Sequence, residues 1–353
     1  MKLLFALLLL FASTAHAHAQ EVVRVYGWKD YIDPQVLEDF QAHSGITVDY
    51  QSFTTTHELL EALAAGTDYD VVMPSHFMLD QLIAGGHLTP LDTRRLRHYT
   101  SLDPWLLSTL AGIPAANRHA VPYLWGSIGL VVDPQQARAH YAGTLPNSWR
   151  LLFDPEQAAK LSPCGLGMLD AAEETGSLLL NYRGRRLSAS SNRQIARQLR
   201  GLETIAPLLR TLDNWNFVDE LIAGRLCLAM AWSGHAARAM EGNPQLRYQI
   251  PDEGAAMYID TLAIPTHAAH PQLAYRLIDF LIDPTVAIRN ARATHFYPPL
   301  PSASPLMQAF ASEHPVQVLT AEQRRRSYLL ESLSPQQKQV LDEAWARVRA
   351  ARH

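Results

Sequence analysis

The stretch VVRVYGWKDYIDP, residues 22–34, predicts a β-strand followed by a turn and the start of a helix. Residues 22–28 are rich in valine and aromatic side chains, which are typical of strands. Asp33 and Pro34 match the N-cap and first position of a helix, and Gly45 matches its end. This strand–turn–helix unit is the beginning of an α/β pattern.

Large and charged side chains follow the predicted strand directly, at Trp28, Lys29, Asp30 and Tyr31. Strand ends more often carry small turn formers such as glycine, asparagine or serine. One explanation is a surface turn that happens to be aromatic. The other is the wall of a binding site, in which an indole face and a carboxylate would contact a cation.

Strand and helix patterns keep alternating after this unit. Residues 46–53 and 68–75 predict strands, and residues 54–66 and 77–86 predict the helices that follow them. Such alternation with short connections is typical of a parallel, doubly wound sheet, whose ligands bind beyond the carboxyl ends of the strands. The segments that follow the first and third strands should therefore share one face of the protein.

Two apolar segments farther along, residues 120–132 and 248–265, predict strands that cross between two lobes. Residues 191–212 predict one amphipathic helix. The predicted fold class is α/β, with two lobes of mixed sheet flanked by helices, linked by the crossing strands, and a ligand cleft between them. The predicted division is residues 20–124 with 258–302 for the first lobe and residues 125–257 with 303–353 for the second.

Composition excludes several classes of partner. With 48% apolar and 18% charged residues the chain can bury large cores, and its 353 residues suit two domains. The net charge is only −4, and no long run of lysine and arginine is present, so we expect no nucleic-acid partner. The short cluster Arg324–Arg326 is interpreted as a solvated helix face.

Residues 1–19 predict a secretory signal peptide. Lys2 precedes an apolar run over residues 3–12, and two A-x-A cleavage patterns follow, ending at Ala17 and Ala19. This run is too short to span a bilayer, and no later apolar run reaches that length. We expect an exported protein that is not membrane-embedded, located in the periplasm.

Export changes the interpretation of Cys164 and Cys227, the only two cysteines. In an oxidising compartment they pair or remain two free thiols, and pairing is the simpler interpretation. No phosphate-binding loop, nucleophile elbow or zinc-binding motif occurs, and the histidines are scattered. We therefore expect no cofactor, no metal and no enzymatic activity.

Aromatic residues recur beside carboxylates at predicted strand ends. Trp28 lies near Asp30, Tyr258 lies near Asp260, and Trp232 ends a further strand. Each pair taken alone fits a core ring beside a capping acid. Together, on one side of a cleft, they favour an ammonium ligand, which gains both cation–π attraction and charge-assisted hydrogen bonds.

At these residues the chain resembles the periplasmic polyamine-binding proteins of bacterial ABC importers, of the putrescine and spermidine type. The resemblance rests on the ordered segments GWKDYI, YDVVMPS, VPYLWG, IPDEGAAMYIDTLAIP and FLIDPTVA and extends over nearly the whole chain after residue 19. It implies a type II periplasmic-binding-protein fold that closes over a polyamine as a monomer and delivers it to an inner-membrane permease. It implies a disulfide between Cys164 and Cys227. The ligand contacts that it implies are Trp28, Asp30, Tyr31, Ser75, Glu174, Trp232, Tyr258, Asp260 and Tyr297.

Two positions depart from the family pattern. Lys29 stands where serine or threonine is usual, and His235 stands where putrescine-binding members carry an acid. We count both as candidate ligand contacts. If Lys29 faces the cleft, an ω-amino acid or another monoamine becomes an alternative ligand; if it faces solvent, Asp30, Glu174 and Asp260 still suit a dication.

Two other functions remain open at this point. An exported hydrolase could use an aspartate and a glutamate as acid and base, although neither lies in a recognisable catalytic motif. A sensor component could bind the same ligand and signal to a membrane receptor.

Overall fold

The structure is a computed structural model that describes residues 21–314 and 319–352. The predicted signal peptide lies outside the described residues. The strands are β1 Val22–Trp28, β2 Thr47–Phe53, β3 Val71–Val72, β4 Ala120–Val132, β5 Leu166–Met168, β6 Thr211–Leu212, β7 Leu228–Trp232, β8 Arg247–Gln249, β9 Ala256–Ala263 and β10 Tyr328–Leu329.

The helices that precede β7 are α1 Pro34–Ser44, α2 Thr56–Ala64, α3 Leu79–Ala84, α4 Pro104–Leu110, α5 Pro134–His140, α6 Arg150–Phe153, α7 Pro155–Leu161, α8 Ala172–Tyr182, α9 Asn192–Leu199 and α10 Asn216–Ile222. Those that follow it are α11 Ser233–Gly242, α12 Pro271–Leu281, α13 Pro284–Thr294, α14 Pro305–Glu313, α15 Ala321–Arg326 and α16 Pro335–Ala350.

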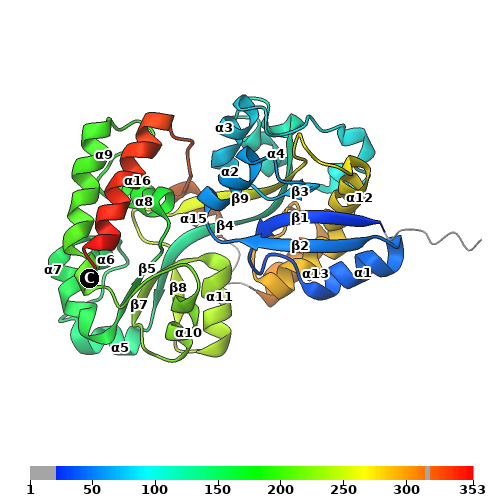
Figure 1. Ribbon diagram of the computed structural model, residues 1–353. Helices are drawn as coiled ribbons and strands as arrows, with labels where there is room; N and C mark the ends of the chain where they lie inside the picture. Colours follow the sequence, from blue (N-terminus) through cyan, green and yellow to red (C-terminus); the bar gives the residue numbers. More distant parts are fainter. Residues whose placement is uncertain (1–20, 315–318, 353) are drawn as a thin grey trace, which may run out of the picture.

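Within the described residues the strands form one mixed sheet of 10 strands, ordered β2-β1-β3-β9-β4-β7-β5-β6, with β10 beside β9 and β8 beside β4. Pairing is parallel within β2-β1-β3, within β7-β5-β6 and between β10 and β9. The pairs β3-β9, β9-β4, β4-β7 and β4-β8 are antiparallel. Helices flank both ends of this sheet (Figure 1). We call the half that contains β1–β3, α1–α4, α12 and α13 the first lobe, and the half that contains β5–β7, α5–α11 and α16 the second lobe.

Strand β4 is the main connection between the lobes. Its first part, from Ala120 to Ile128, pairs with β9, and its last part, from Ile128 to Val132, pairs with β7. All of its residues are buried, as expected for a strand that is covered on both faces. The prediction of crossing strands is therefore confirmed, although the sheet continues across both lobes instead of being divided between them.

The opening stretch folds as its sequence predicts. β1 covers residues 22–28, and the Asp33 carboxylate accepts a hydrogen bond from the Gln35 backbone N–H at 3.0 Å, so that it caps α1. The helix ends at Gly45, whose φ of 74° is the left-handed conformation that glycine adopts without steric cost. The carboxyl end of β1 is thereby fixed at the edge where the lobes meet.

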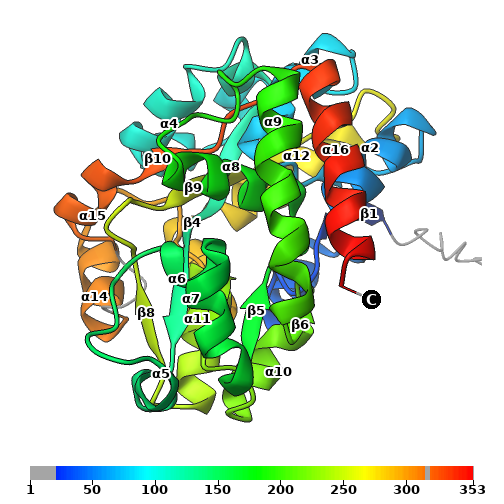
Figure 2. The same cartoon turned by 90° about the vertical axis from the view of Figure 1, so that its left-hand side faces the viewer.

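The predicted helix over residues 191–212 is wrong in length. α9 ends at Leu199, and the chain continues as short 3₁₀ turns to β6. Gly201 and Pro207 explain the break, because glycine weakens a helix and proline removes a backbone donor from it. α16 packs beside α9 (Figure 2) and against α8, which places the end of the chain on the second lobe.

Cys164 and Cys227 form a disulfide, with their Cα atoms 5.5 Å apart. The bond joins the segment before β5 to the start of β7, within the second lobe. It therefore stabilises one lobe and leaves the connection between the lobes free. Over the described residues, the helices are all too short or too polar to cross a membrane.

Candidate functional site

A small cavity of about 40 Å³, which we call the inner cavity, lies between the lobes at the carboxyl ends of β1 and β7. The first lobe, the second lobe and the crossing strand β9 all contribute to it, as expected for a site that closes around its ligand. Its lining residues are Trp28, Tyr31, Thr54, Ser75, Glu174, Trp215, Trp232, His235, Tyr258, Asp260 and Phe296. The cavity therefore joins residues that are far apart in the sequence.

Asp260 is the charged group at the centre of the inner cavity. It lies on β9, is only 2% exposed, and accepts hydrogen bonds from the hydroxyl groups of Tyr31, at 2.7 Å, and Ser75. Burial raises the pKa of Asp260 to about 6, and the two hydroxyl donors limit that rise. Among the described residues, no lysine, arginine or histidine forms an ion pair with it. Asp260 is thus a buried carboxylate that two hydroxyl groups hold in place and that has no cationic partner among the described residues.

Glu174 lies on the first turn of α8, on the second-lobe side of the same cavity. Burial is the main cause that raises its pKa to about 8, and repulsion from Glu173 and Asp260 adds to it. At neutral pH the Glu174 carboxyl is therefore mostly protonated while the Asp260 carboxyl is mostly ionised. A cation that enters the cavity would favour the ionised form of both.

Aromatic rings surround the two acids. Tyr31 and Phe296 pack with ring centroids 4.7 Å apart, and Gly234 makes room for Phe296, because a Cβ there would lie 2.6 Å from that ring. Trp28 and Trp232 contribute further faces. Such walls suit the methylene groups of an alkylamine and offer π-faces to its ammonium group.

His235 lies among these rings, at the start of α11. The rings of Trp215 and Trp232 meet it edge-on, at centroid distances of 5.1 and 5.6 Å. Burial, with added repulsion from Arg238 and His295, lowers the pKa of His235 to about 3. The imidazole is therefore neutral at physiological pH, and this wall of the cavity carries no charge.

Two predicted contacts, Lys29 and Asp30, do not line the inner cavity. Asp30 is exposed, has a φ of 58°, and pairs with Arg238 of α11 at 3.8 Å. The Lys29 ammonium lies 5.2 Å from the centroid of the Trp215 ring. These two pairs, which we call the rim contacts, connect the turn after β1 to the second lobe.

Tyr297 is also outside the cavity lining. Its backbone pairs with Trp125 of β4, and its fully buried ring packs on the Trp125 ring. The preceding residue, Phe296, lines the cavity instead, because adjacent side chains of an extended segment point in opposite directions. The other predicted contacts, Trp28, Tyr31, Ser75, Glu174, Trp232, His235, Tyr258 and Asp260, come together in the lining.

Sequence reasoning missed Thr54 and Trp215. Thr54 directly follows β2, so the rule that ligands bind beyond the carboxyl ends of strands could have identified it. Trp215 follows β6, which the predicted helix over residues 191–212 concealed. The indole N–H of Trp215 is buried without a hydrogen-bond partner among the described residues.

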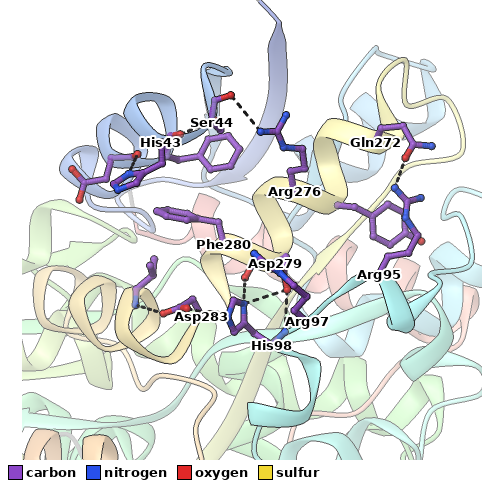
Figure 3. Close-up of a pocket in the computed structure, with 14 residues that line it drawn as sticks. His43, Ser44, Arg95, Arg97, His98, Gln272, Arg276, Asp279, Phe280 and Asp283 are labelled. Atoms are coloured by element: carbon purple, nitrogen blue, oxygen red, sulfur yellow. Dashed lines mark hydrogen bonds and ion pairs between the residues drawn. The ribbon is translucent and has the colours of Figure 1, made fainter.

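A larger depression of about 630 Å³ lies on the first lobe, between α1 and α12 (Figure 3). Basic side chains contact its acids: Arg97 contacts Asp279 at 3.2 Å, and His98 contacts Asp283 at 3.0 Å. Asp39, the third acid of this groove, contacts Arg289, so among the described residues the groove offers a ligand no acid that lacks a basic partner. The inner cavity, with its unpaired acid, is therefore the better candidate site.

Comparisons with known proteins agree with this architecture. The "Putrescine/agmatine-binding protein" of Pseudomonas aeruginosa is 31% identical over 339 residues, which are 94% of this chain and 92% of the relative. The "Putrescine-binding periplasmic protein PotF" of Escherichia coli K12 is 29% identical, over 95% of this chain and 93% of the relative.

The fold matches solved structures as well. A "Putative spermidine/putrescine ABC transporter from Listeria monocytogenes" superposes with a TM-score of 0.84 at 24% identity, covering 93% of this chain and 99% of that one. This match confirms the predicted two-lobe periplasmic-binding-protein fold. The family model for bacterial extracellular solute-binding proteins matches residues 35–315. The chain belongs to the bacterial extracellular solute-binding protein family.

Proposed function

We propose that this protein captures a polyamine of the putrescine or spermidine type in the inner cavity and delivers it to an ABC importer. Its ammonium group would lie against Asp260, its methylene groups between the aromatic rings, and closure of the lobes would exclude water. Exclusion of water strengthens each ammonium–carboxylate contact, because the effective dielectric falls. Catalysis has no part in this function.

The observation that carries the proposal is the unpaired state of Asp260. A buried carboxylate normally has a cationic partner, because an isolated buried charge costs several kcal/mol. Here the Tyr31 and Ser75 hydroxyl groups hold the carboxylate in place, and no protein cation among the described residues pairs with it. A ligand ammonium would complete the pair. The polyamines named for the relatives carry that group.

Export and delivery follow from the same assignment. The predicted signal peptide would direct the chain to the periplasm, and the permease would be an inner-membrane complex that the closed monomer recognises. The lobe division predicted from the sequence is part of this proposal. Support comes from β4 and β9, which connect the two halves of the sheet, and from α16, which packs on α8 and α9.

An ω-amino acid or another monoamine is the second candidate ligand. It is favoured by the wall around His235, which is neutral and includes the unpartnered indole N–H of Trp215. That N–H can only donate, so it suits a carboxylate or amide oxygen. A carboxylate-dependent hydrolase is less favoured, because two hydroxyl groups already bind the Asp260 oxygens.

A ligand panel tests the proposal. We expect putrescine, cadaverine, agmatine or spermidine to raise the melting temperature of the protein and to bind in calorimetry. The matched neutral control, 1,4-butanediol, should do neither, because it lacks the ammonium group that would pair with the Asp260 carboxylate. A response confined to ω-amino acids would favour the second candidate. An absence of response to every amine would contradict the proposal.

A further inference from the structure

A second recess, which we call the outer recess, lies at the mouth of the inner cavity and has a volume of about 320 Å³. The two share a boundary, because the same four side chains line both: Trp28, Thr54, Glu174 and Trp232. A ligand longer than the inner cavity would therefore extend past Glu174 into the outer recess. The charged side chains of the outer recess therefore determine how long a polyamine the site accepts.

The outer recess contains acids, but protein cations already pair with them. Arg349 and the indole N–H of Trp345 both bind Asp170 at 2.7 Å. The Lys338 ammonium contacts Glu173 at 3.1 Å and both oxygens of Asp342 at 2.5 and 2.7 Å. Each of these three acids of the recess, Asp170, Glu173 and Asp342, thus contacts a protein cation, whereas Asp260 in the inner cavity contacts none among the described residues.

Lys338 differs from the other cation of the recess in its chemistry and place. Its primary ammonium group is the same group that a polyamine carries, and the side chain is 27% exposed. Burial alone would lower the pKa of Lys338, but Glu173 and Asp342 raise it above the usual range, so the ammonium stays charged. Its charge also acts on Glu174, at the boundary of the two spaces.

We propose that Lys338 is a specificity residue that occupies the ammonium position of the outer recess and so limits the site to short amines. This inference rests on the proposed function. A diamine or monoamine that fits the inner cavity avoids Lys338. A triamine such as spermidine would bring a further ammonium to Glu173 and meet the lysine charge there, and like charges in contact disfavour a complex.

The test measures the ratio of spermidine to putrescine affinity by calorimetry in the whole protein. Lys338→Met keeps most of the side-chain length and removes the charge, so we expect it to raise this ratio by roughly tenfold. Lys160→Met is the matched control, because Lys160 is an exposed lysine on α7 whose loss changes the net charge equally. It should leave the ratio unchanged, as should Lys338→Arg.

The gain should depend on the two acids that Lys338 releases, Glu173 and Asp342. In the triple variant Lys338→Met/Glu173→Gln/Asp342→Asn we expect the ratio to return to within about twofold of the original value, because the third ammonium again lacks a carboxylate. Lys338→Gln gives a second removal of the charge should the methionine variant fold poorly. An unchanged ratio in both Lys338→Met and Lys338→Gln would overturn the inference, as would a gain that survives in the triple variant. In either case, continued binding of putrescine would leave the proposed function standing; a protein that binds no amine would overturn both.

Discussion

Asp260 and Glu174 line the same cavity, yet their surroundings give the two carboxyl groups different pKa values. Asp260 is 2% exposed and Glu174 is 8% exposed, so burial penalises the charge of both. Two hydroxyl donors stabilise the Asp260 carboxylate, while Glu174 has a second acid, Glu173, beside it. Their pKa values accordingly differ, at about 6 and about 8. The comparison indicates that Asp260 is charged before the ligand arrives and that Glu174 becomes charged in response to it.

The largest effect should come from removing the prepared charge. Asp260→Asn keeps the shape of the side chain but leaves a buried ammonium without its anion, so we expect amine affinity to fall by about 100-fold or more. Calorimetry with putrescine measures the loss. Asp39→Asn, on the outer side of the first lobe, is the control with the same chemical change. Equal affinities in Asp260→Asn and wild type would show that the comparison names the wrong acid.

The next largest effect should come from removing the hydroxyl donors while keeping the Asp260 carboxylate. Ser75→Ala and Tyr31→Phe each remove one hydrogen bond to the Asp260 carboxylate, which should weaken amine binding by about tenfold. Both donors stabilise the ionised form, so each variant should also raise the pKa of Asp260. The pH below which binding is lost, near the present pKa of about 6, should therefore move upward. A pH series of affinities measures that midpoint, and an unmoved midpoint would contradict the role of the donors.

Substitution of Glu174 should change the number of protons released on ligand binding more than it changes the affinity. With a pKa of about 8 the carboxyl is protonated at pH 7, so an arriving ammonium should displace a proton from it. Calorimetry in buffers with different ionisation enthalpies measures the release. We expect close to one proton in the wild type and close to none in Glu174→Gln, with affinity at pH 7 lowered only a few-fold. The wild-type affinity should rise between pH 7 and 9, while that of the variant stays level. Equal release in both proteins would refute a responsive Glu174.

The smallest effect should come from the rim contacts, whose charged residues Lys29, Asp30 and Arg238 do not line the cavity. Arg238→Ala and Lys29→Met remove one exposed pair each, and exposed pairs contribute little, so we expect affinity to change by about two- to threefold. The loss should shrink at high salt for Arg238→Ala, because salt screens exposed charges. A loss as large as that of Asp260→Asn would show that the turn after β1 contacts the ligand after all.

Much of the fold was predictable because local chemistry determines it. The valine-rich run of β1, the Asp33 cap and the terminal Gly45 of α1 act within a few residues, and the structure has them where the sequence places them. The uninterrupted apolar run of β4 similarly required burial on both faces. The helix predicted over residues 191–212 failed because its amphipathic spacing was weighed above the glycine and proline within it.

The sequence by itself determined that a carboxylate and aromatic side chains would meet at strand ends, since the alternation of strands and helices fixes that edge. Only the tertiary structure decided which neighbours take part. Lys29 and Asp30 turn to the rim because the strand stops at Trp28 and Asp30 adopts a left-handed conformation. Phe296 replaces Tyr297 because one residue reverses the direction of a side chain in extended backbone. The acids of the outer recess receive protein cations from Lys338 and Arg349 of α16, and the packing of α16 against the second lobe, which no local pattern encodes, brings them there.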